Sequence, residues 1–129
     1  LRLVETGGLD LLRDVYSPFL FGEKWQKQNR KSFLKSSCYT PIKKNDGVWH
    51  LLRAGENTTW DVNWNKIDVP ILNITGLQDQ VFRNDEVITE LLAQLQNVKV
   101  IEYADAGHMI PIETPKKLTQ DILKFTERL

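Results

Sequence analysis

Two short apolar segments rich in β-branched residues, 69–75 and 98–103, constrain the fold of this chain more than any other feature. The first segment is ended by Gly76 and holds Pro70 near its start, where a missing N–H is tolerated. The residues between the two segments predict a helix, because their apolar side chains recur at helical spacing: Val87, Ile88, Leu91, Leu92 and Leu95. A short connection through a helix makes the two strands parallel. Parallel sheets normally have more than two strands, so we expect either further strands from residues outside this chain or an unusual fold.

The same region predicts where its helices begin and end. Asn84 is a suitable N-cap for the helix between the strands, and Asn97 can end it. Thr114 followed by Pro115 is typical of a helix start, since proline is favoured at the first helical position. The apolar side chains of this final helix share one face: Leu118, Ile122, Phe125 and Leu129. Residues 67–129 are therefore predicted to form an α/β unit in the order strand, helix, strand, helix.

Residues 1–66 predict helices and no strand. An amphipathic helix is expected after the break at Gly7-Gly8, from the spacing of Leu9, Leu12, Val15, Tyr16 and Leu20. Pro18 should end or bend this helix. A second helix is expected from Trp25 to Leu34, followed by a polar turn region over 41–47. The chain is thus divided at residue 66 into a helical segment and the α/β unit.

Composition and charge argue against several classes of protein. Lys+Arg and Asp+Glu both number 17, so no net field attracts nucleic acid or a membrane surface. No apolar run approaches the ~20 residues of a membrane span, and residues 1–10 lack the pattern of a signal peptide. The single cysteine, Cys38, forbids an internal disulfide and fits a reducing compartment, so we expect a cytoplasmic protein. The chain begins at Leu1 without a methionine, which we interpret as a processed or incomplete polypeptide.

Cofactors, metals and nucleic acid are not expected partners. The chain has no metal-ligand spacing and no glycine-rich loop that would hold a phosphate. One basic stretch lies near Trp25 and Phe33, and it consists of Lys24, Lys27, Arg30, Lys31 and Lys35. These charges are spread around helical positions, so we interpret them as a solvated helix face.

Asp79 and His108 are the candidate catalytic residues. Asp79 is the only acid in the loop 76–82 after the first strand, and His108 is the only base in the loop 104–111 after the second. Functional groups in open parallel sheets gather at the carboxyl ends of the strands. The two residues are 29 positions apart on neighbouring elements, so an Asp–His hydrogen bond is expected. Such a carboxylate would fix the imidazole tautomer and stabilise the imidazolium.

Other polar and aromatic residues receive structural interpretations. Asp105 is expected to form a turn, and Glu113 is expected to cap or to favour the dipole of the last helix. His50 lacks a comparable context and is interpreted as a structural or surface residue. The tryptophans at 49, 60 and 64 are expected either to line a substrate pocket or to pack on the sheet.

The two regions around Asp79 and His108, VPILNITGLQDQVF and VKVIEYADAGHMIPIETPKKLTQDILKF, resemble the C-terminal third of α/β-hydrolases. Within this family, the two regions most resemble those of esterases, enol-lactonases and cofactor-free haloperoxidases. The resemblance implies that Asp79, in a Gly-x-x-Asp loop, is the catalytic acid and that His108, in a Gly-His loop, is the catalytic histidine. It further implies that 67–129 is the last β-α-β-α portion of a hydrolase sheet. Residues 1–66 resemble the helical lid of these enzymes more loosely.

The chain departs from this family in its nucleophile. The family carries it on a strand-to-helix turn of the form Gly-x-Ser-x-Gly, and neither this pentapeptide nor an oxyanion-hole loop is present. Ser36, Ser37 and Cys38 form the only cluster within the chain worth testing as a substitute, and we interpret Cys38 as a small apolar residue. Little hydrolysis is therefore expected from this chain alone.

Two functions follow from these observations. The first is a portion of a serine-hydrolase-type enzyme that acts on an ester, lactone or similar acyl substrate, with the nucleophile (Ser, Asp or Cys) supplied elsewhere. The second is a non-catalytic, hydrolase-derived binding or oligomerisation module, in which a second chain or copy completes the sheet.

Overall fold

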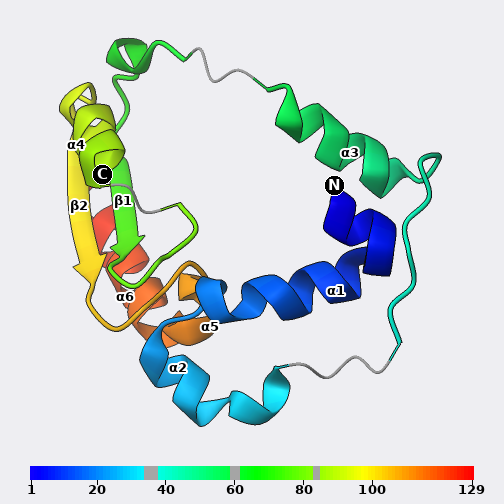
Figure 1. The fold of residues 1–129 in the computed structure, drawn as a ribbon. Coiled ribbons are helices and arrows are strands. Elements are labelled where there is room, and N and C mark those ends of the chain that lie inside the picture. The colour runs from blue at the N-terminus through cyan, green and yellow to red at the C-terminus, as the bar shows by residue number, and fades with distance from the viewer. Residues whose placement is uncertain (34–37, 59–61, 83–84) are drawn as a thin grey trace. The chain divides into compact units, whose positions relative to one another are not determined.

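The computed structural model describes residues 1–33, 38–58, 62–82 and 85–129 (Figure 1). The chain forms two compact units. The first comprises Leu1–Pro18 and Asn29–Asp61, and the second comprises Phe19–Gln28 and Val62–Leu129. Segment 19–28, which lies within the predicted lid 1–66, is thus part of the second unit. The predicted cap Asn84, the candidate nucleophiles Ser36 and Ser37, and Lys35 and Trp60 lie outside the described residues.

The second unit contains a parallel pair of strands, β1 (Ile71–Gly76) and β2 (Val98–Tyr103). Their register runs from Ile71 opposite Val98 to Gly76 opposite Tyr103. The prediction of a parallel α/β pair is confirmed, and the second strand has the predicted bounds. The first strand begins one residue after Pro70, where the Ile71 N–H donates to the carbonyl of Asn97 at 2.8 Å. Within the described ranges the sheet has two strands.

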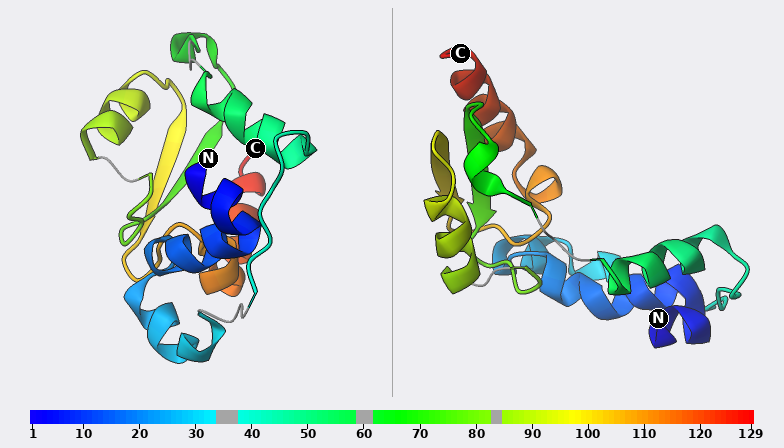
Figure 2. Two further views of the ribbon diagram at one scale, coloured as in Figure 1. Left: turned by 45° about the vertical axis from the view of Figure 1, so that its right-hand side comes forward. Right: turned by 90° about the horizontal axis from the view of Figure 1, so that it is seen from above.

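Helices α4 (Asp85–Ala93) and α6 (Pro115–Thr126) lie on opposite faces of this sheet, as the views in Figures 1 and 2 agree. The alternation of side chains along the strands explains this arrangement. Thr75 and Val100 line a hollow with Ile88 of α4. Both helices are shorter than predicted, so Leu95 and Leu129 lie beyond their ends. Thr114 holds the N-cap position of α6, but its side chain makes no capping hydrogen bond.

The core of the second unit lies at the carboxyl end of the sheet. Tyr103, Ala106 and Ile110 are buried together, and three partly buried side chains pack against them: Ile74, Ile101 and Leu118. The Tyr103 hydroxyl donates to Oδ2 of Asp121 on α6 at 2.7 Å. Burial and this carboxylate together raise the pKa of the Tyr103 phenol above its ordinary value. The best-packed part of the unit therefore supports the loops that follow the strands.

Segment 19–28 holds the last residues of α1 (Arg2–Leu20) and the short helix α2 (Glu23–Gln28). The helix predicted from Trp25 to Leu34 is present but shorter, because α2 ends at Gln28 and a separate 3₁₀ turn covers Arg30–Ser32; Leu34 lies outside the described residues. Pro18 lies inside α1, and the helix continues two residues beyond it. The break expected at Gly7-Gly8 is present as a kink, where Gly8 has φ 70°.

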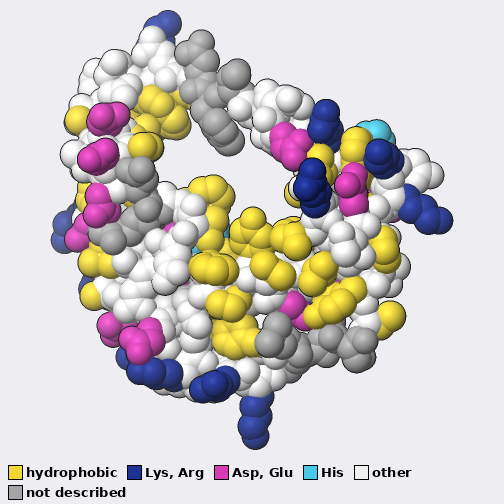
Figure 3. Space-filling model, in the orientation of Figure 1, with side chains coloured by type: hydrophobic (Ala, Val, Ile, Leu, Met, Phe, Trp, Pro, Cys, Tyr) yellow, Lys and Arg dark blue, Asp and Glu magenta, His cyan; other side chains and the backbone are white. Residues whose placement is uncertain are grey.

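The first unit joins α1 to the later segment 38–58, which includes helix α3 (Gly47–Glu56). The Ile42 N–H donates to the carbonyl of Val4 at 2.9 Å, and the Trp49 indole donates to Glu5 at 2.9 Å. Trp49 therefore joins α3 to α1 within this unit. Hydrophobic side chains lie along the surface of α1 (Figure 3), and Leu9, Val15 and Tyr16 of this helix are exposed.

In the part of the chain that the structure describes, no helix is both long enough and apolar enough to cross a bilayer.

Candidate functional site

The loop after β1 presents Asp79 through a tight turn. The Asp79 N–H donates to the carbonyl of Gly76 at 3.2 Å, and the Leu77 N–H donates across to the carbonyl of Tyr103 at 3.0 Å. Oδ1 of Asp79 accepts the N–H groups of Val81 at 2.8 Å and Phe82 at 3.1 Å. An aspartate commonly stabilises a turn by accepting backbone N–H groups that follow it. These bonds occupy one carboxylate oxygen and leave the other to face a partner.

The loop after β2 presents His108 through a different anchor. The N–H groups of His108 and Met109 both donate to the carbonyl of Leu20, at 2.8 and 3.1 Å. Helix α5 (Ile110–Glu113) follows at once, with Ile110 in the core. The position of His108 is therefore set by its own strand and by segment 19–28 of the same unit.

Asp79 and His108 meet, as their spacing predicted. His108 Nδ1 lies 2.9 Å from Asp79 Oδ2, and the side chains are 32% and 14% exposed. Because an ionised carboxylate only accepts hydrogen bonds, Nδ1 carries the proton and Nε2 is the acceptor nitrogen of the neutral ring. The Phe82 ring lies 5.0 Å from the His108 ring, centre to centre, and tilts across it by 47°.

The surroundings of Asp79 favour its ionised form. Partial burial alone would raise its pKa, but the hydrogen bonds from Val81, His108 and Phe82 outweigh this effect. The pKa of the Asp79 carboxyl is therefore held below its ordinary value of 3.8. An anionic Asp79 can hold the imidazole in one tautomer and stabilise its protonated form.

The two loops approach each other so closely that glycine is required at Gly76 and Gly107. A Cβ on Gly76 would lie 2.1 Å from the carbonyl oxygen of Gly107. A Cβ on Gly107 would lie 2.7 Å from the nitrogen of Gly22. Both neighbours are backbone atoms that cannot swing aside, so the Asp79–His108 distance depends on these contacts.

Sequence reasoning missed two residues that hold the site together. Glu113 Oε2 accepts the Gly22 N–H at 2.7 Å, and its carboxylate also accepts the Gly107 N–H at 3.0 and 3.2 Å. Gln78 accepts the Glu23 N–H at 2.7 Å and donates to the carbonyl of Ala104 at 3.1 Å. Of the two roles expected for Glu113, the capping role is corrected, because its carboxylate bonds Gly22 and Gly107 rather than the start of α6; its effect on the helix dipole stays a prediction. The partner Gly22 lies 91 residues away, and no local pattern signals such a contact.

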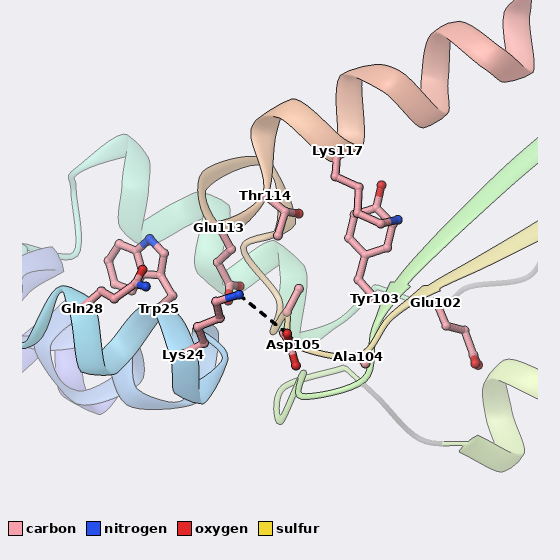
Figure 4. A pocket seen from close by; sticks show the side chains of 11 residues that line it. Lys24, Trp25, Gln28, Glu102, Tyr103, Ala104, Asp105, Glu113, Thr114 and Lys117 are labelled. Atoms are coloured by element: carbon pink, nitrogen blue, oxygen red, sulfur yellow. Dashed lines mark ion pairs between the residues drawn. The ribbon is translucent and has the colours of Figure 1, made fainter.

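Two hollows adjoin the site. One, of about 600 Å³, is lined beside Asp79 by Phe21, Glu23, Gln26, Leu77, Gln78 and Gln80. The other, of about 440 Å³, lies between α2 and the start of α6 (Figure 4). Its wall includes Trp25, Tyr103 and the ion pair of Lys24 with Asp105 at 3.9 Å. Asp105 lies in a turn, as predicted.

The remaining candidates lie away from the imidazole. Among the described residues, no hydroxyl or thiol forms a hydrogen bond with the His108 ring. Cys38 is exposed and belongs to the first unit, as does His50, an exposed residue edge-on to Trp49. Half-buried Trp64 lies in the 3₁₀ turn Trp64–Lys66. Over the described ranges, no three His, Cys, Asp or Glu side chains are grouped to hold a metal ion.

Comparison with models of known protein families gives no match for this chain, and comparison with curated proteins gives none either.

Proposed function

We propose that this chain supplies the catalytic acid and histidine of a serine-hydrolase-type α/β-hydrolase acting on an ester, lactone or similar acyl substrate. The nucleophile would come from a polypeptide segment outside this chain. Residues 67–129 would be the last β-α-β-α portion of the hydrolase core, and residues 1–66 its lid. In a parallel sheet, side chains at the carboxyl ends of neighbouring strands meet substrate together.

The observation that carries the proposal is the 2.9 Å hydrogen bond between His108 Nδ1 and Asp79 Oδ2. It joins an anionic acid to an imidazole that, in its neutral form, presents Nε2 as the nitrogen that accepts a proton. The loops that hold the pair are fixed by backbone bonds, so the geometry exists before any substrate binds. Such preorganisation is what an acid–base pair requires.

In the proposed reaction His108 Nε2 takes the proton from the nucleophile as the nucleophile attacks the acyl carbonyl. The resulting imidazolium stays beside the Asp79 carboxylate and then gives its proton to the departing group. Water repeats the sequence on the acyl intermediate and releases the acid. Asp79 remains ionised throughout, which agrees with its lowered pKa. Without the nucleophile, the chain alone should be a poor catalyst.

The test uses p-nitrophenyl acetate, because an unprotonated Nε2 can itself attack an activated ester and release p-nitrophenolate. We expect slow release in excess of that of His108→Ala, which keeps the background reaction of His50 and the amines. This excess should fall at least about tenfold in Asp79→Asn, where the tautomer is no longer fixed. His50→Ala is the matched control and should keep the His108-dependent excess. Mass spectrometry should locate the acyl group on His108.

Two results would oppose the proposal. Equal release by the wild type and His108→Ala would mean that the imidazole is not a competent base. An acyl group on Cys38 or on a serine, with fast turnover, would place the nucleophile inside this chain.

The second candidate function is a non-catalytic binding or oligomerisation module. It is favoured by a sheet that has two strands in the described ranges, each paired along one side. Unpaired strand edges recruit other strands, from a partner or from another copy. Sedimentation over a range of concentrations tests it. A concentration-dependent dimer without His108-dependent ester chemistry would support this function over the first.

A further inference from the structure

Glu113 is an acid whose carboxylate bonds the backbone of two segments at the site. It accepts the Gly22 N–H at 2.7 Å and the Gly107 N–H at 3.0 and 3.2 Å. Figure 4 shows its side chain extending from the end of α5 towards α2. Gly107 directly precedes His108, so this carboxylate holds the residue next to the imidazole.

A second set of bonds runs in the opposite direction between the same two segments. The carbonyl of Leu20 accepts the N–H groups of His108 and Met109. Glu113 thus bonds segment 19–28 from the end of α5, while Leu20 of segment 19–28 bonds His108 and Met109. Each pair of bonds restrains the other, because Gly22 is two residues from Leu20 and Gly107 is adjacent to His108.

We propose that Glu113 is a positioning residue that couples the docking of segment 19–28 to the Asp79–His108 hydrogen bond. Bonds to an ionised acceptor are stronger than bonds to a neutral one, so the carboxylate fixes both N–H groups firmly. An amide at this position has only one acceptor oxygen and brings a donor group towards two N–H groups. The inference concerns the geometry of the pair and stands whether or not acyl transfer is detected.

The chain suits a direct test, because it has only two histidines, His50 and His108. Histidine labelled with ¹⁵N gives ring signals from two imidazoles, with two nitrogens each, and His50→Gln assigns them. In the wild type, we expect an Nδ1 proton on His108 that exchanges slowly with water. In Glu113→Gln, we expect this proton to exchange about tenfold faster or more, together with the amides of Gly22 and Gly107.

Asp105→Asn is the matched control, since Asp105 also follows β2 but, among the residues that the structure describes, its carboxylate pairs with Lys24 alone, across 3.9 Å. The His108 signal should be unchanged in this variant. Glu113→Asp, which keeps the charge but is one methylene shorter, should give an intermediate rate. An unchanged His108 Nδ1 proton in a folded Glu113→Gln protein would overturn the proposal.

A measurement on the wild type keeps the proposal falsifiable if the variants do not fold. Coupling requires the Gly22 amide, the Gly107 amide and the His108 Nδ1 proton to open together. Their protection against hydrogen exchange should therefore be equal, and lower than that of the β2 amides. Clearly different protection at the three sites would show that they open independently, against the proposal.

Discussion

Oδ2 of Asp79 accepts a hydrogen bond from His108 Nδ1 at 2.9 Å, and this bond joins the loops that follow β1 and β2. Oδ1 of the same carboxylate closes its own turn. The acid is therefore fixed by its own loop, and the histidine is fixed by segment 19–28.

Asp79→Asn should reduce the dependence of stability on pH in acid. The pKa of Asp79 is lower in the folded chain than its ordinary value of 3.8, so ionised Asp79 stabilises the fold at higher pH. That contribution is fully present above the unfolded pKa and is lost as pH falls through the folded pKa. Denaturant unfolding should show a difference between wild type and variant that is largest above about pH 5 and shrinks on acidification below 3.8. A difference that grows in acid would contradict the direction of the shift.

Gly76→Ala should destabilise the second unit and break the Asp79–His108 bond. The added Cβ would lie 2.1 Å from the Gly107 carbonyl oxygen, and relieving this overlap costs about 1–3 kcal/mol. Gly55→Ala in α3 is the control, because its Cβ meets nothing within 4 Å. Alanine in a helix should stabilise by about 0.4–1 kcal/mol. Thermal unfolding and the His108 ring signal measure both effects, and equal behaviour of the two variants would refute the steric argument.

Gln78→Ala should loosen the start of α2 while leaving the strands intact. The substitution removes two hydrogen bonds, one accepted from the Glu23 N–H and one donated to the carbonyl of Ala104. Each bond contributes about 1 kcal/mol to the free energy of unfolding. Hydrogen exchange should become faster at the Glu23 amide and remain unchanged in β2. Gln80→Ala, two residues along at an exposed position, serves as the control. If the Glu23 amide exchanges as slowly in Gln78→Ala as in the wild type, Gln78 does not hold the start of α2.

Tyr103→Phe should lower the free energy of unfolding by about 1 kcal/mol. Asp121 loses the phenolic donor but keeps its hydrogen bond from Lys117 at 2.8 Å. The pKa of the phenol is raised in the folded chain, so its contribution is present below the unfolded pKa and is lost as pH rises through the folded value. Ultraviolet titration of the three tyrosines should therefore lose a late-ionising component in the variant. A titration curve identical to that of the wild type in its alkaline part would refute the assignment.

The parts of the fold that sequence could predict are those set by local pattern. The strand 98–103 and the helix starting at Pro115 follow from β-branched residues and from proline at the first helical position. The Asp79–His108 hydrogen bond was also predictable, because parallel neighbouring strands bring the ends of their loops together.

The remaining features depend on contacts between distant residues. Gly22 bonds Glu113 across 91 residues and Glu23 bonds Gln78 across 55, so nothing near residues 19–28 indicates that they join the second unit. The end of α2 at Gln28 was missed because the residues after it continue to favour a helix. The catalytic roles of Asp79 and His108 stay predictions until the ester experiment is done.

The chain leaves the second unit after Gln28 and returns to it at Val62, which has a consequence for biosynthesis and for engineering. Residues 19–28 leave the ribosome well before Gln78 and Glu113 exist, so their docking must wait until almost the whole chain is made. The intervening residues belong to the first unit, where Ile42 bonds Val4 and Trp49 bonds Glu5. A tag or domain inserted there must therefore leave these two hydrogen bonds in place.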